Sequence, residues 1–121
     1  MAQLQIQLPP LGNDKVYEVK QSMRAHKDAL EAQTNISQLE VDISEATDYE
    51  AGRMVVDQLK YMSDYLEKTL RLSDEELDML WELKLTTVIV IFKYVTSSVM
   101  GAISITFDEA VEGLGIEDEM I

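Results

Sequence analysis

The stretch TDYEAGRMVVDQLKYMSDYLEKTLRLSDEEL, residues 47–77, decides the fold because it contains the start signals of two helices. Thr47 and Glu50 form a capping-box pattern, in which the threonine side chain accepts from a backbone amide and the glutamate side chain reaches back. Ser73 and Glu76 repeat the pattern, and acids in the first turn complement the positive end of the helix dipole. The stretch therefore predicts a long helix that begins at Thr47 and a short helix that begins at Ser73.

The long helix is predicted to continue to about Arg71, because its apolar residues recur at intervals of three and four and so share one face. Tyr61 and Tyr65 are four residues apart and fall on a flank of that face. The apolar stripe consists of Ala51, Val55, Leu59, Met62, Leu66 and Leu70.

Upstream of this stretch, the first 19 residues have the pattern of a β-hairpin. Residues 2–8 alternate apolar side chains with glutamines, which is the period of a strand with one buried face. Residues 9–14 read PPLGND, a sequence with turn chemistry, and residues 16–19 are expected to form the returning strand.

Between the hairpin and Thr47, the pattern changes along the chain. Residues 20–34 are predicted to be helical, and His26 is expected to be a partly exposed helix residue without a catalytic or metal-binding partner. In residues 35–46, apolar side chains alternate with acids, so this segment is expected to be a short strand or an extended linker.

Downstream, Leu85 to Thr87 are expected to contain a turn or kink, and residues 88–100 are ambiguous. Val88 to Phe92 have strand propensity, but apolar residues continue at helical spacing and Gly101 stands where a helix often ends. We prefer a buried helix of about four turns. Since so small a domain has few elements to cover an apolar helix, we expect a second subunit to cover part of it.

The C-terminal residues 102–121 contain six acids and no basic residue, which favours a loosely ordered acidic tail, with a short helix expected around residues 107–111. The predicted fold is therefore mainly α. Residues 1–101 form a small helical domain with a short N-terminal β-hairpin (1–19), and residues 102–121 form the tail.

Composition excludes several classes of function. The chain has 121 residues, 23 acids and 10 basic residues, for a net charge of −13. The basic residues are spread singly, so the chain lacks the cationic face that binds nucleic acid or an anionic membrane. Solubility by self-repulsion is a sufficient explanation for the acidity of the chain. The apolar run that begins at Val88 is too short to span a bilayer.

Catalytic and cofactor-binding patterns are missing from the sequence as well. It has no cysteine, one histidine, and no glycine-rich phosphate loop. Its many acids have no pair that stands out, and helix capping explains the cluster after Ser73 better than a calcium loop does. We expect a protein that is not an enzyme and that needs no metal or cofactor.

The apolar residues point instead to polypeptide binding. The chain has seven methionines, and methionine adapts to irregular partners. Tyrosines suit a groove because their hydroxyls prefer a wet edge, whereas Met54, Met62, Trp81 and Phe92 also fit a plain core. Our candidates for a client groove or a self-association surface are Tyr61, Tyr65, Trp81, Phe92 and Tyr94.

The order of elements resembles the tail assembly chaperones of long-tailed phages (siphoviruses), especially those that infect Gram-positive bacteria. The resemblance covers roughly residues 1–101. It rests on the N-terminal strand pair, a helix like Met23 to Leu30, a long helix like Met54 to Leu70, the Ser73 helix start and an apolar helix that ends near Gly101. It is a resemblance of order and pattern without a diagnostic motif.

The resemblance implies a non-enzymatic role in the cytoplasm of the infected cell. Such proteins oligomerise on the long, helical, hydrophobic tape measure protein and keep it soluble until tail tube protein subunits replace them. They are generally absent from the mature virion, and many have a longer form made by translational frameshifting, for which the segment after Gly101 is a natural junction.

The residues leave a second hypothesis open. A small acidic helical regulator or inhibitor, whose surface mimics nucleic acid, binds a basic protein partner with strong salt dependence. A chaperone instead forms concentration-dependent oligomers and solubilises its client, so the two hypotheses predict different behaviour.

Overall fold

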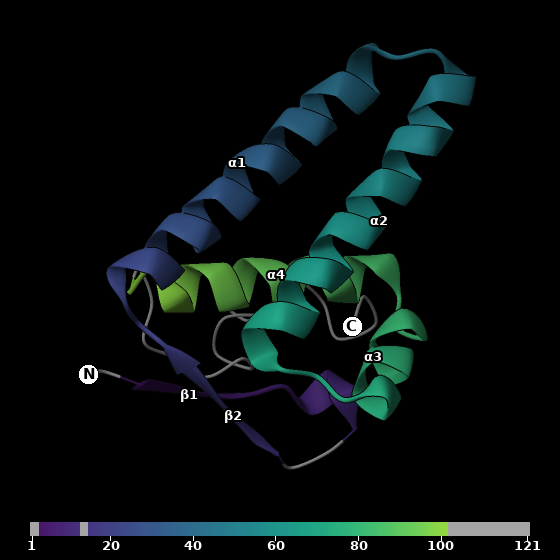
Figure 1. Ribbon diagram of the computed structural model, residues 1–121. Helices are drawn as coiled ribbons and strands as arrows, with labels where there is room; N and C mark the ends of the chain where they lie inside the picture. The colour runs from purple at the N-terminus through teal and green to yellow at the C-terminus, as the bar shows by residue number, and fades with distance from the viewer. Residues whose placement is uncertain (1–2, 13–14, 102–121) are drawn as a thin grey trace.

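The computed structural model describes residues 3–12 and 15–101 (Figure 1). Within these residues the fold is mainly α with a short N-terminal β-hairpin, as the sequence predicts. The predicted acidic tail and its short helix lie outside the described residues. In chain order the elements are β1 (Gln3–Gln7), a 3-10 turn η1 (Pro9–Leu11), β2 (Val16–Lys20), α1 (Met23–Glu45), α2 (Asp48–Leu70), α3 (Asp74–Trp81) and α4 (Leu85–Val99).

The predicted β-hairpin is present, with β1 and β2 antiparallel and Ile6 opposite Tyr17. Ile6 and Leu8 are buried, while the glutamines that precede them at positions 5 and 7 are exposed, so the period-two pattern places one face of the sheet on the core. Between the strands, Gly12 adopts a left-handed conformation with φ of 71°, which a glycine reaches at little cost.

Helix α1 corrects the expectation of a strand or linker at residues 35–46, because it continues unbroken to Glu45. The alternating apolar residues Leu39 and Ile43 are four apart, so they also share a helical face, and Ile36 precedes them on it. Gln38 donates to the Asp42 carboxylate across one helical turn at 2.9 Å. The alternation of apolar and acidic residues in this segment is therefore also compatible with helical spacing, and it does not indicate a strand.

The predicted capping signals hold at both helix starts. The Thr47 side chain accepts from the Glu50 amide at 3.3 Å. At α3 both halves of the capping box are present, since Ser73 Oγ accepts from the Glu76 amide and Glu76 Oε1 accepts from the Ser73 amide. These caps separate α2 from α3 and fix where the chain changes direction.

The ambiguous segment forms helix α4, as preferred, and Gly101 follows its end with φ of 74° in the left-handed region. The expected turn lies earlier, at residues 82–84, so Leu85 to Thr87 already belong to the helix. The chain itself covers most of α4, so cover by a second subunit stays a prediction for the remaining part of its surface. Ten of its 15 residues are buried within this chain.

The cover on α4 comes from three sides. Figure 1 shows α1 and α2 as a long antiparallel hairpin, with α4 crossing its base and the β-hairpin on the far side of α4. Gln33 on α1 donates to the Thr96 hydroxyl on α4 at 2.8 Å, and Phe92 packs edge-on against Tyr65 of α2. The core therefore lies where the α1–α2 hairpin meets α4.

Glu76 joins the β-hairpin to α3. Its carboxylate accepts hydrogen bonds from the Tyr17 hydroxyl, from the Ser73 amide and from Lys15 Nζ, the last two at 3.1 Å. Burial of the carboxylate raises its pKa, but these hydrogen bonds outweigh burial and lower the pKa from 4.5 to about 2. The folded state thus favours the charged form of Glu76.

We expect Glu76→Gln to remove roughly 1.5–3 kcal/mol of stability at neutral pH, the usual range for hydrogen bonds to a charged group, because the variant lacks the charged form that the lowered pKa favours. A lowered folded-state pKa gives stability that is present above pH 4.5 and is lost as the pH falls toward 2. Urea unfolding of the natural chain and the variant should therefore differ at neutral pH and converge in acid. Glu75→Gln, an exposed neighbour on α3, is the control. A constant difference across this pH range would contradict the assignment.

Candidate polypeptide-binding surface

The far half of the α1–α2 hairpin projects beyond the rest of the domain. Buried residues end at Ile36 on α1 and begin again at Gln58 on α2, and none of residues 37–57 is buried. In Figure 1 this part of the hairpin extends away from α3, α4 and the strands. We call residues 37–57 the arm.

The arm carries apolar side chains that no other part of the fold covers fully. Val41, Tyr49 and Val56 are 49%, 78% and 48% exposed, and Leu39, Ile43, Met54 and Val55 are half-buried between the two helices. It also has six acids, against Arg53 as its one basic residue. Two helices alone leave part of each apolar face in water, so the arm has the composition of a partner-binding surface.

On α2 the arm leads directly into a pocket. Val56, Leu59 and Ser63 are spaced by three and four residues and therefore share one helical face. Leu59 and Ser63 line a pocket of about 140 Å³ whose other walls are Leu80, Trp81, Leu83, Leu85 and Val88. We call it the Trp81 pocket. The arm and this pocket form one continuous, largely apolar strip.

Trp81 lies at the end of this strip and is 48% exposed. The sequence leaves Trp81 open between a groove and a plain core, and in the structure Leu80 of the same helix is buried and Leu77 is half-buried, whereas Trp81 is not buried. The reason is that α3 has eight residues and buries one edge against the core, while Trp81 is its last residue. A tryptophan that is half in water and borders a pocket is well suited to anchor a partner.

Tyr61 and Tyr65 lie at the α1–α2 interface, away from the walls of the Trp81 pocket. The Tyr61 hydroxyl accepts from Asn35 of α1 at 2.8 Å. The Tyr65 ring packs against Phe92 with centroids 5.5 Å apart. Burial raises the pKa of the Tyr65 hydroxyl, a hydrogen bond with Thr69 opposes the increase, and the Asp28 carboxylate adds to it. Both tyrosines are half-buried and so combine packing with an accessible edge.

The other two candidates, Phe92 and Tyr94, belong to the core. They are 1% and 5% exposed, because they lie on α4, which the chain itself covers. In the folded chain a partner reaches neither side chain. Of the five candidates, the structure brings Tyr65 and Phe92 together, leaves Trp81 on the surface, and does not gather all five into one groove.

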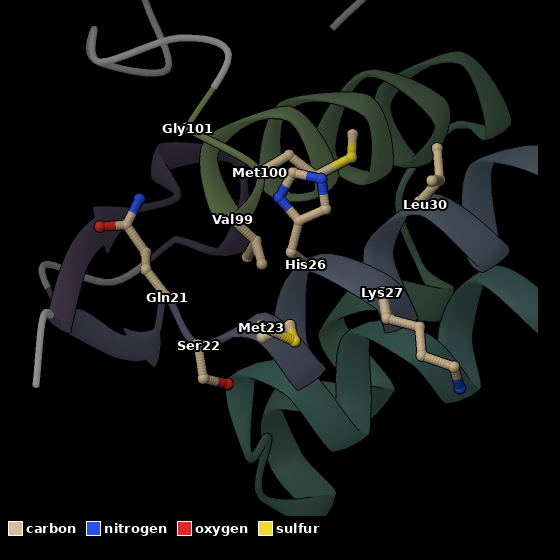
Figure 2. Close-up of a pocket in the computed structure, with 9 residues that line it drawn as sticks. All are labelled: Gln21, Ser22, Met23, His26, Lys27, Leu30, Val99, Met100 and Gly101. Carbon is tan, nitrogen blue, oxygen red and sulfur yellow. The ribbon is translucent and has the colours of Figure 1, made fainter.

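A second, larger pocket of about 550 Å³ lies between the start of α1 and the end of α4 (Figure 2). Its walls include Met23, His26 and Leu30 on α1 and Val99 and Met100 on α4. Met23 is 90% exposed, and Leu30 is 51% exposed. His26, on which the sequence places no chemistry, is an exposed helix residue on the wall of this pocket.

Three residues of this strip were not predicted to belong to a binding surface. The stripe predicted for α2 includes Val55 and not Val56, Leu83 has no predicted role, and Leu85 is predicted to lie in a turn or kink. Two features of the sequence indicate this strip. They are the helical spacing of Val56, Leu59 and Ser63 and the two leucines on either side of Lys84. The arm itself was hidden by the strand-like pattern of residues 35–46.

Two searches of the described residues bear on other functions. Over residues 3–12 and 15–101, no cluster of three or more histidine, aspartate or glutamate side chains is arranged to hold a metal ion. In the same part of the chain, no helix has the length and apolar character needed to cross a membrane.

Comparison of the chain with protein-family models, with curated proteins and with solved structures finds no match. The case for a function therefore depends on the geometry of this chain and on the pattern of its sequence.

We expect substitutions of Phe92 and of Trp81 to differ in their effect on stability. Phe92→Ala removes a buried ring that packs on Tyr65 and should cost about 3–5 kcal/mol of unfolding free energy. Trp81→Ala removes a half-exposed ring and should cost less than about 1.5 kcal/mol. Urea unfolding followed by circular dichroism measures both. Equal costs would show that Trp81 is a core residue rather than a surface anchor.

Proposed function

We propose that this protein is a non-enzymatic phage tail assembly chaperone, which binds the helical, hydrophobic tape measure protein and keeps it soluble until the tail tube assembles. The observation that carries the proposal is the arm: residues 37–57 form two helices without a buried residue, and they carry exposed apolar side chains among six acids. An incomplete helical layer of this kind is completed by another helix.

The client helix packs along the strip from Val56 through Leu59 to the Trp81 pocket. Its apolar side chains enter the spaces beside these residues, and its basic side chains face acids of the arm such as Asp57. Burying one exposed valine or leucine side chain is worth at most about 1.5–3 kcal/mol. A few such contacts, less the free-energy cost of association, give a weak interaction at each site.

Weak binding suits a chaperone that must be displaced. The tape measure protein presents many similar helical segments, so many copies of this chain bind it together and avidity supplies the strength. Tail tube subunits then displace the bound copies of this chain from the tape measure protein one site at a time. Self-association uses the same kind of contact, since two arms offer each other uncovered apolar faces.

The resemblance of the sequence to tail assembly chaperones supports the same role. It implies a protein of the infected host cell's cytoplasm that is absent from the mature virion, with the tape measure protein, other copies of this chain and the tail tube protein as its partners. Catalysis, metals and cofactors have no part in this role.

Co-expression with a tape measure fragment tests the proposal. We expect the natural chain to keep the fragment soluble. The double variant Val56→Asp/Trp81→Ser should weaken each bound site at least about fivefold, a loss of about 1 kcal/mol, and so lower the soluble fraction. The charge placed at position 56 opposes burial of the client, while the domain stays folded because both residues are half-exposed.

Met23→Asp is the matched control, because it also places an acid at an exposed apolar position but lies outside the arm and the Trp81 pocket. It should leave solubilisation unchanged. If the double variant solubilised the fragment as well as the natural chain does, the strip would not be the client site. If the natural chain failed to solubilise it and stayed monomeric at high concentration, the chaperone proposal would be abandoned.

The second candidate, an acidic regulator that binds a basic partner, is favoured by the excess of acids on the arm. It differs from the chaperone in salt dependence. Binding dominated by charge weakens steeply as salt is raised, whereas binding by the apolar strip changes little. Measuring client affinity at low and high salt separates the two.

A further inference from the structure

The pocket between the start of α1 and the end of α4 combines apolar walls with positive charge. We call it the α1–α4 groove. Met23, Leu30, Val99 and Met100 supply apolar surface, and Lys27 lies on its rim (Figure 2). Its volume of about 550 Å³ is within the range of pockets that take a small ligand or a few side chains, roughly 300–1,000 Å³.

The charge beside the groove is unusual for this chain. Residues 20–27 contain Lys20, Arg24 and Lys27 and no acid, although the whole chain has 23 acids and 10 basic residues. Of the three, Lys27 lines the groove, and Asp28 and Glu31 follow it on α1. Lys27 pairs with Glu31 at 3.0 Å, but both side chains are more than half exposed, and such a pair exchanges readily for another partner. The groove therefore suits an apolar segment that carries negative charge.

The chain itself supplies such a segment directly at the groove. Gly101 lines the groove, and residues 102–121 follow it. They begin with Ile103, Ile105 and Phe107 at alternate positions, and then contain six acids and no basic residue. Phe107 is six residues beyond Gly101, so it stays within about 20 Å of the groove whatever the path of the chain.

We propose that the α1–α4 groove is the docking site of the chain's own residues 102–121, whose apolar side chains enter the groove while the acids face Lys27 on its rim and the neighbouring Arg24 on α1. A tethered segment of this length has an effective concentration near a millimolar, so it fills the groove ahead of a free partner of similar affinity. The docking covers Met23 and Leu30, and it requires no tape measure client.

A competition experiment on the full chain tests this docking. The probe is a synthetic peptide of residues 102–121, titrated by calorimetry into the natural chain and into a tail variant with Ile103→Ser, Ile105→Ser and Phe107→Ser. We expect the peptide to bind the tail variant about tenfold more tightly, because an effective concentration near a millimolar competes in the natural chain against a peptide affinity near 100 μM. If the triple variant misfolds, Phe107→Ser alone serves the same comparison.

Reversing the charges on α1 beside the groove tests whether the peptide binds there. Adding Arg24→Glu and Lys27→Glu to the tail variant should weaken peptide binding at least about tenfold. Adding Arg53→Glu and Lys60→Glu, an equal charge change at exposed positions on α2, should alter it less than about twofold.

Several results would overturn the proposal. The peptide could fail to bind the tail variant, or it could bind the natural chain and the tail variant equally. Its binding could also be unchanged by the Arg24/Lys27 reversal. Sedimentation separates docking within one chain from exchange between chains. If the natural chain formed a dimer that the tail substitutions dissociate, the occupant of the groove would be the tail of a second copy.

Discussion

The burial of α4 is the constraint on which the rest of the structure depends. This helix is apolar on most sides, and ten of its 15 residues are buried. The chain achieves this by placing the base of the α1–α2 hairpin on one side of α4 and the β-hairpin on another, with Gln33 bonded to Thr96 and Tyr65 packed on Phe92. Glu76 then fixes α3 to the β-hairpin.

The length of the covering helices explains why a binding surface is left over. Helices α1 and α2 have 23 residues each, about 35 Å, whereas α4 has 15 residues, about 22 Å, and crosses the hairpin at its base. Burial therefore ends at Ile36 and begins again at Gln58. The arm is the part of the hairpin without fully buried residues, and its exposed apolar residues give it the character of a docking surface.

Local signals in the sequence predicted much of this fold, and tertiary packing decided what they missed. The β-hairpin, both helix caps, the long α2 stripe and the glycine after α4 follow from turn chemistry, capping and periodicity, which act within a few residues. Leu39 and Ile43 fit two periods at once, and contact with α2 selects the helical one. How one chain covers α4, and why Trp81 stays exposed while Phe92 and Tyr94 are buried, depend on contacts between distant segments.

Under the proposed function, the arm is open in the free protein and is covered when the client binds. Hydrogen exchange of backbone amides, measured with and without a tape measure fragment, distinguishes the two states. Amides in open helices of low stability exchange readily, and a partner that packs on them slows the exchange. We expect the amides of residues 37–57 and of the segment around Trp81 to exchange more slowly when the fragment binds. Unchanged exchange in the arm, with protection appearing elsewhere on the chain, would contradict it.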